Sequence, residues 1–234
     1  MTKPWVILDG DNTLWDIESS YDDARDRFVR TMYDLGFDKN LVEEFQRRQD
    51  AQLFADFGYS KKRFAKSFEL TLFHFLPHTA KSRVKSVRKI ANSVFNTKPR
   101  LFDEVIGTIA CLKEEFKIGL LTSGPFDLQS QKINLALAEN QSFFDAIEIV
   151  KKKTDNVFLS FCQKNNVDIS ESWMVGDSIV HDVEPALRIG MNAIHVNNNN
   201  WRELEGSKSL FNFSSVPNIS EIIPLVQQRQ LVDA

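Results

Sequence analysis

Two carboxylates follow a short apolar run near the start of the chain. The run Val6–Leu8 leads directly into the sequence Asp9-Gly10-Asp11-Asn12-Thr13. Alternate residues of an extended chain point to the same side, so Asp9 and Asp11 face one space if strand geometry continues past Asp9. Paired carboxylates typically bind a hard cation, share a proton, or do both. An acidic turn after a buried strand is the plainer alternative, and the pair alone does not decide between them.

Later apolar runs also end in polar residues. Residues 117–121 lead into Thr122 and Ser123, residues 146–150 lead into a run of lysines, and residues 173–175 lead into Gly176 and Asp177, with Asp182 five residues further on. The carboxyl ends of parallel strands meet at one edge of a sheet, where open α/β folds bind their ligands. These polar side chains are therefore expected to converge.

The elements needed to position them alternate along the second part of the chain. Strands are expected at 117–121, 146–150, 173–175 and 193–196, and helices at 103–116, 125–138, 154–162 and 179–189. Pro125 and Thr154 are typical of helix starts, and Gly190 is typical of a helix end. Strand and helix alternation of this kind predicts a parallel sheet covered on both faces.

The segment after the first strand has a different pattern. Apolar residues recur there at three- and four-residue steps over 17–37, 41–57, 61–76 and 78–95, which predicts helices and no strand. Its many phenylalanines are typical of the core of a small bundle. We therefore predict an α/β Rossmann-like core, residues 1–14 and 97–234, with an inserted all-helical cap, residues 15–96.

This set of motifs resembles the haloacid dehalogenase-like superfamily. Its DxDxT motif matches residues 9–13, its Ser/Thr motif matches Thr122, its lysine lies in Lys151-Lys152-Lys153, and its GDxxxxD motif matches residues 176–182. The resemblance covers nearly the whole chain, since the helical insert also stands where the family has its cap.

The resemblance implies a phosphatase mechanism. Asp9 would attack phosphorus and form an aspartyl-phosphate, and Asp11 would act as general acid and then as general base. Mg²⁺ would be held by Asp9, the main-chain carbonyl of Asp11 and Asp177, while Thr122 would grip phosphate oxygens and Asp182 would orient the lysine or a metal-bound water.

Some assignments stay open at this point. Lys153 fits the lysine motif best because it precedes the helix start, but Lys152 is one residue away. Ser123 stands where many relatives have asparagine and is expected to touch the substrate. Trp15 is a candidate substrate contact or a hinge residue, and the segment 57–61 of the insert is a second candidate contact. His181 and His195 receive no role, because His181 stands at a variable position of the GDxxxxD motif and His195 lies in an apolar strand.

Composition bounds the remaining possibilities. The net charge of −3, with 42% hydrophobic and 26% charged residues, does not favour nucleic acid or an anionic membrane as a partner. Cys111 and Cys162 have no CxxC partner, and neither a leader nor a membrane span is apparent. A reduced cytoplasmic protein, monomer or homodimer, is expected.

The function predicted on these grounds is hydrolysis of a small phosphorylated metabolite. A phosphomutase, a phosphotransferase and a non-catalytic phosphate-binding regulator are the alternatives. The acid at Asp11 argues against a pure binding role, and also against dehalogenase activity, because relatives that cleave carbon–halogen bonds lack an acid there. Response-regulator receiver domains share acidic strand ends but are much shorter and have no helical insert.

Overall fold

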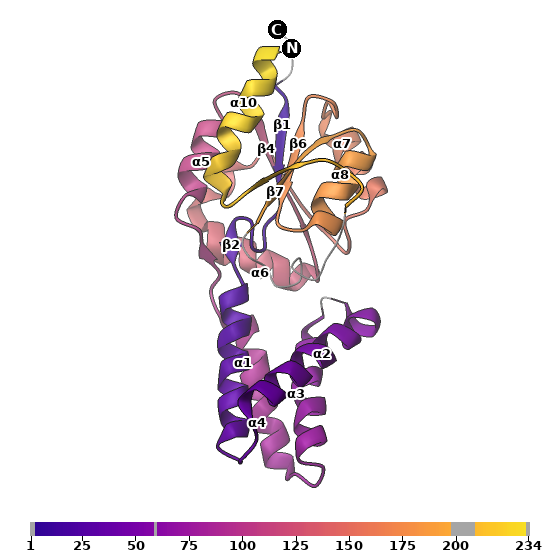
Figure 1. The fold of residues 1–234 in the computed structure, drawn as a ribbon. Coiled ribbons are helices and arrows are strands. Elements are labelled where there is room, and N and C mark those ends of the chain that lie inside the picture. The colour runs from indigo at the N-terminus through magenta and orange to yellow at the C-terminus, as the bar shows by residue number, and fades with distance from the viewer. Residues whose placement is uncertain (1–2, 59, 198–208, 233–234) are drawn as a thin grey trace. The chain divides into compact units, whose positions relative to one another are not determined.

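The chain folds into two compact units. The computed structural model describes residues 3–58, 60–197 and 209–232 (Figure 1). One unit comprises residues 1–16 and 99–234, and the other comprises residues 17–98. The insert thus begins and ends two residues later than the range 15–96 expected from the sequence. Tyr59, in the candidate contact segment 57–61, lies outside the described residues.

A six-stranded parallel sheet forms the centre of the first unit. Its strands lie in the order β5-β4-β1-β6-β7-β8, with β1 between β4 and β6. All four residues of β1 are buried, as expected of a central strand covered on both faces. The strands are β1 Trp5–Leu8, β4 Lys117–Ser123, β5 Ala146–Val150, β6 Trp173–Gly176, β7 Asn192–Val196 and β8 Ser214–Val216.

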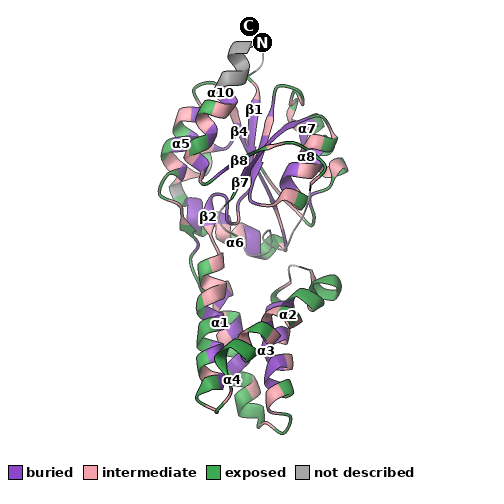
Figure 2. Ribbon diagram, viewed as in Figure 1, coloured by how far each residue is buried: buried purple, intermediate pink, exposed green. Residues whose placement is uncertain are grey.

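Helices cover both faces of this sheet. Figure 1 shows α5 (Val105–Leu112) and α10 (Ile222–Val232) on one side, and α7 (Asp155–Asn165) and α8 (Glu184–Arg188) on the other. A core cluster joins α7 and α8 to the sheet, and Figure 2 shows the buried strands between the helices. The remaining elements are α6 Phe126–Leu137, the 3₁₀-helices η2 Ala138–Phe143 and η4 Ile219–Glu221, and the π-helical turn η3 Ile179–Val183.

The chain order places the carboxyl end of β1 at the switch point of the sheet. From β1 the chain goes to β4 and β5 on one side, and then crosses to β6, β7 and β8 on the other. Crevices at such a point are where open α/β sheets bind ligands.

The second unit is helical. It contains α1 Glu18–Tyr33, α2 Lys39–Phe57, α3 Lys61–Phe75, α4 Lys81–Asn92 and the 3₁₀-helix η1 Ser93–Asn96. Phe28, Phe64 and Phe68 are buried in its core, with the Phe28 and Phe68 rings stacked at 4.4 Å. Phe54, Phe57 and Phe73 are 36–40% exposed, so the expected aromatic core includes only part of the phenylalanine pattern.

Short elements depart from the expectation. Trp15 and Asp16 form a strand, β2, which pairs with β3 (Arg100–Leu101) in a two-stranded antiparallel sheet. This pairing places Trp15 in the first unit. No pattern in the sequence predicted β8 or α10. No helix in the described ranges is both long enough and apolar enough to cross a membrane.

Candidate active site

The loop after β1 separates the two carboxylates of the first motif. The Asp9 amide still donates to Val175 O at 2.9 Å, but the Leu14 and Trp15 amides then both turn back to Gly10 O. Asn12 takes a left-handed conformation, with φ of +59°, which asparagine tolerates better than most residues. Strand geometry therefore ends at Asp9, and the two carboxylates have different hydrogen-bond partners.

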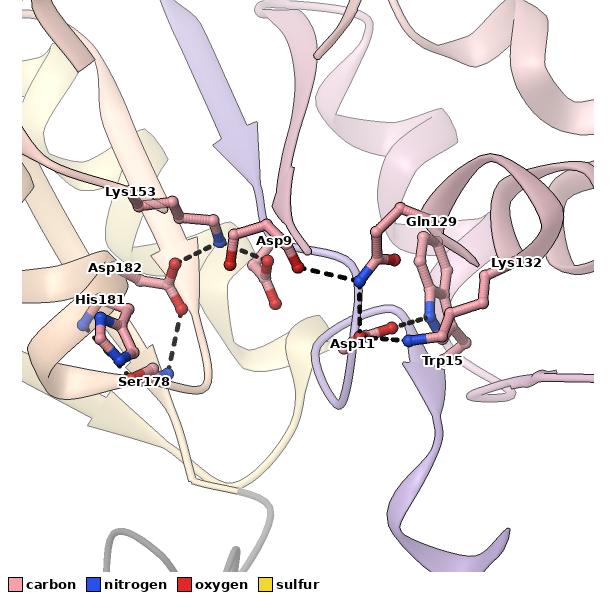
Figure 3. A network of polar contacts seen from close by, with 10 residues as sticks. Asp9, Asp11, Trp15, Gln129, Lys132, Lys153, Ser178, His181 and Asp182 are labelled. Carbon is pink, nitrogen blue, oxygen red and sulfur yellow. Dashed lines mark hydrogen bonds and ion pairs between the residues drawn. The ribbon is translucent and has the colours of Figure 1, made fainter. Parts of the chain in front are cut away.

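Lys153 is the buried cation of the site. Its ammonium group pairs with Asp9 Oδ1 and with Asp182 Oδ1, the latter at 2.5 Å (Figure 3). Burial alone would lower the pKa of Lys153, but the charges and hydrogen bonds of Asp182 and Asp9 outweigh it and raise that pKa. Lys152 is exposed, whereas Lys153 is buried beside Asp9 and Asp182, so the placement favours Lys153 as the lysine of the motif.

Asp182 supports the lysine from the π-helical turn after β6. Its Oδ1 accepts from Lys153 and its Oδ2 accepts from the Ser178 amide at 3.1 Å. The carboxyl group packs directly on Gly176, where an added Cβ would lie 2.3 Å from Asp182 Oδ2. A glycine at the end of β6 is therefore what lets Asp182 reach the lysine.

Three carboxylates provide a donor set for a cation. Asp9, Asp177 and Asp182 each offer an oxygen, and these oxygens lie within 4.8 Å of one another. All three are buried, and carboxylate oxygens are the ligands that a hard divalent cation prefers. Burial raises the pKa of Asp9 to about 7, although the Lys153 ammonium opposes this rise.

The residues present therefore fit a divalent cation, which would offset the excess negative charge. Both oxygens of Asp182 already accept hydrogen bonds, and Asp9 and Asp177 stay the predicted side-chain ligands. The main-chain carbonyl of Asp11 stays a predicted ligand.

The carboxylate of Asp11 receives three donors. Trp15 Nε1 donates to Oδ1 at 2.7 Å, while Gln129 Nε2 and Lys132 Nζ donate to Oδ2 at 3.0 and 2.5 Å (Figure 3). Burial alone would raise the pKa of Asp11, but the charge of Lys132 and the three hydrogen bonds outweigh it and lower that pKa. This conformation favours the anion, whereas a general acid needs a raised or switchable pKa.

Gln129 and Lys132 are site residues that the sequence reasoning missed. Both lie on α6, which begins directly after the strand that ends in Thr122 and Ser123, and Gln129 Nε2 also donates to Ser123 O at 2.9 Å. Their spacing of three residues places them on one face of that helix. Polar residues on the first turns of this helix were the available signal.

Trp15, a candidate substrate contact or hinge residue, lies buried beside Asp11, and its contact with a substrate stays a prediction. Its side chain is fully buried, and its ring lies against Gly10, where an added Cβ would come within 2.5 Å of Trp15 Cζ2. The indole holds Asp11 by its hydrogen bond. Trp15 therefore acts on the site through Asp11.

Thr122 lies at the end of β4 with its hydroxyl unpaired. The residue is 1% exposed, and Thr122 Oγ1 has no hydrogen-bond partner among the described residues. An unpaired buried hydroxyl costs about 1–3 kcal/mol, so such a group is informative about what the site binds. Ser123, half-buried beside it, contributes its carbonyl to Gln129.

Together these residues combine a buried carboxylate and lysine with an unpaired hydroxyl and further carboxylates at one sheet edge. The arrangement suits a tetrahedral oxyanion, because a lysine and a cation can offset the charge that would otherwise repel the Asp9 carboxylate.

Comparison with known proteins points the same way. Residues 6–196 match the family model described as haloacid dehalogenase-like hydrolase. A glyceraldehyde 3-phosphate phosphatase of Methanopyrus kandleri is 26% identical over 208 residues, which cover 86% of each chain. The N-acylneuraminate-9-phosphatase of Mus musculus is 32% identical over 98 residues, 40% of this chain and 39% of the relative.

A solved structure shares the fold over the whole chain. The haloacid dehalogenase-like family hydrolase from Xanthomonas campestris superposes with a TM-score of 0.78 and 20% identity, covering 99% of this chain and 95% of that one. At this identity the likeness describes the fold alone.

Proposed function

This chain belongs to the haloacid dehalogenase-like hydrolase family, and from that premise we propose that it is a Mg²⁺-dependent phosphatase of a small phosphorylated metabolite. The observation that carries the proposal is the buried Asp9–Lys153 pair at the end of β1, next to Asp177 and Asp182. Both curated relatives named above are phosphatases of small metabolites, which supports the same substrate class. A cytoplasmic location belongs to this proposal, and two cysteines without a disulfide are compatible with it.

In the first step Asp9 forms a bond to phosphorus. Its Oδ1 accepts from Lys153, so Oδ2 is the oxygen that we assign to the attack. The phosphorus–oxygen bond to the leaving group breaks as an Asp9 aspartyl-phosphate forms, and Asp11 gives its proton to the leaving oxygen. Lys153 and the Thr122 hydroxyl donate hydrogen bonds to the phosphate oxygens.

In the second step water attacks the aspartyl-phosphate. Asp11 takes the proton from that water, the Asp9–phosphorus bond breaks, and inorganic phosphate is released with the Asp9 carboxylate restored. Bound Mg²⁺, held by Asp9 and Asp177, supplies positive charge that favours ionised Asp9 and offsets charge on the phosphate.

The contacts of Asp11 add a requirement to this mechanism. Lys132 lies 2.5 Å from Asp11 Oδ2 and stabilises the anion, so Asp11 must separate from Lys132 before it can carry a proton to the leaving group. The hydrogen bonds from Gln129 and Trp15 hold the carboxylate in its present position.

Substitution of the nucleophile tests the proposal directly. We expect Asp9→Asn to lower turnover of an aryl phosphate by about 10⁴-fold or more, because the amide cannot form the covalent intermediate. Wild-type protein should release inorganic phosphate without any acceptor alcohol, and chelation should stop that release until Mg²⁺ is restored.

The control makes the same chemical change on an exposed helix position. Asp26→Asn, on α1, should keep wild-type turnover. Wild-type activity in Asp9→Asn would exclude Asp9 as nucleophile, and activity that survives chelation would exclude the metal. Phosphate release that requires a sugar-phosphate acceptor would favour a phosphomutase.

A further inference from the structure

His195 occupies a buried position in the sheet, where an apolar side chain would need no hydrogen-bond partner. It lies in β7 between Ile194 and Val196, which are fully or almost fully buried, and is itself 5% exposed. Burying an imidazole in such a strand is unfavourable unless both ring nitrogens find hydrogen-bond partners. The partners that it finds connect it to the proposed metal site.

Both ring nitrogens are paired. Nε2 lies 3.1 Å from the main-chain oxygen of Asp177, and Nδ1 lies 3.0 Å from Ser215 Oγ. Because a carbonyl oxygen only accepts, Nε2 carries the proton and donates, and in the neutral ring Nδ1 accepts from the Ser215 hydroxyl.

The sheet register explains why this ring reaches Asp177. Gly176, His195 and Ser215 lie in register across β6, β7 and β8. The pairing of β6 with β7 ends at Gly176 and His195, so the backbone of Asp177 lies just beyond the ladder. The His195 side chain supplies a donor at that point and holds the first residue after the strand.

We propose that His195 is a positioning residue for the metal site, which it fixes by anchoring the main chain of Asp177 to β7. This inference rests on the metal assignment of the proposed function. Asp177 offers its carboxylate to the same cation as Asp9, so a change in its backbone changes the distance between the two ligands. Groups that orient metal ligands typically change metal affinity about 10- to 100-fold when they are removed.

Two substitutions at His195 distinguish the roles of its two ring nitrogens. The amide nitrogen of glutamine can take the place of Nε2, whereas asparagine is shorter and reaches only toward Ser215. We expect His195→Asn to weaken Mg²⁺ binding about 10-fold or more, and His195→Gln to keep wild-type affinity. Isothermal titration calorimetry of Mg²⁺ into chelator-treated protein measures the affinity independently of activity.

A measurement on the wild-type protein does not depend on whether a variant folds. Nitrogen NMR of the His195 ring should show the neutral form protonated at Nε2, with signals that shift when Mg²⁺ saturates the protein. Ser215→Ala is the matched control, because it removes the Nδ1 partner and keeps the bond to Asp177, and it should retain wild-type Mg²⁺ affinity.

The outcomes that overturn the inference are distinct from those that overturn the proposed function. Wild-type protein that binds no Mg²⁺ overturns the metal assignment and the inference with it. Wild-type protein that binds Mg²⁺, with equal affinity in a folded His195→Asn variant or with ring signals unmoved by Mg²⁺, overturns only the role of His195. Loss of affinity in Ser215→Ala or His195→Gln equal to that in His195→Asn would also overturn it.

Discussion

At the scale of single residues, Asp9 and Asp11 differ in what surrounds them. Asp9 pairs with a buried lysine and faces further carboxylates, whereas Asp11 is held by an indole, an amide and a second lysine. Two aspartates that are two positions apart can thus take different chemical tasks, because the loop between them turns back on Gly10. A nucleophile and a proton carrier need this difference in environment.

Asp11→Asn should affect substrates according to their leaving group. An alkoxide leaves poorly without a proton, so turnover of an alkyl phosphate should fall about 10²- to 10⁴-fold. A nitrophenolate leaves without help, so with p-nitrophenyl phosphate the variant should release one equivalent rapidly and then stall, because water is no longer activated. Rapid-quench and stopped-flow kinetics measure both phases.

The wild-type protein and Asp26→Asn provide the comparison, and neither should show a burst followed by a stall. Wild-type turnover of both substrates by the variant would show that Asp11 has no part in proton transfer. The aryl substrate also reports whether the variant is folded, since the burst itself requires an intact Asp9 and Lys153.

Most of the site residues that could be predicted from the sequence stand at strand ends, and Asp182 was predicted from the motif that follows β6. Asp9, Thr122, Lys153 and Asp177 follow apolar runs, and the structure places each of them at the carboxyl edge of the sheet. Their catalytic roles stay predictions. Gln129 and Lys132 were missed because polar residues on the first turns of a helix do not indicate which group they contact across the fold, and the indole of Trp15 could not be distinguished from a ligand contact.

At the scale of elements, the site depends on the close fit of the π-helical turn against the end of β6. Gly176→Ala should destabilise the protein by about 1–3 kcal/mol and lower catalytic efficiency, because the new Cβ would lie 2.3 Å from Asp182 Oδ2 and displace a support of Lys153. Urea unfolding and steady-state kinetics measure the two effects.

Gly107→Ala is the matched control for this substitution. Gly107 lies in α5 with open space around its missing side chain, so alanine there should stabilise the protein by about 0.5–1 kcal/mol and leave catalysis unchanged. Unchanged activity in Gly176→Ala would show that Asp182 can shift without moving Lys153.

The packing of α7 on the sheet makes a prediction for high pH. Burial raises the pKa of the Cys162 thiol from 9.0 to about 11, so the unfolded chain loses this proton first as the pH rises. The contribution of the protonated Cys162 thiol to the free energy of unfolding is therefore complete below about pH 9 and is lost as the pH rises toward 11. The wild-type advantage over Cys162→Ala should shrink by about 1 kcal/mol between pH 8.5 and 10, measured by urea unfolding. A difference that stays constant with pH would show that Cys162 titrates normally.

Strongly periodic elements were predictable, and short ones were not. The helices of the insert and the strands β4 to β7 follow clear apolar patterns, and the predicted α/β class is confirmed. β8 has three residues, two of them exposed, so it shows no apolar alternation, and β2 is defined only by its pairing with β3. Such elements depend on a partner that is distant in the sequence.

At the scale of the whole molecule, one compact unit is inserted within another. The chain leaves the α/β unit after residue 16 and returns to it at residue 99, and each unit has a core cluster of its own. A nested unit with its own core can unfold as a separate cooperative step. The prediction that the protein is a hydrolase is confirmed by its membership of the family. The contribution of the helical unit to substrate choice stays a prediction.

Calorimetry of two core variants tests this independence. Phe68 is fully buried in the helical unit and Phe161 is fully buried in the α/β unit, and truncation of either to alanine should cost about 3–5 kcal/mol. Phe68→Ala should lower only the transition temperature of the helical unit, and Phe161→Ala only that of the α/β unit.

Mg²⁺ binds through Asp9 and Asp177 in our proposal, so it should raise the transition temperature of the α/β unit in Phe68→Ala as much as in wild type, because a ligand stabilises the unit that binds it. A single transition that responds to both substitutions and to Mg²⁺ would show that the two units unfold as one.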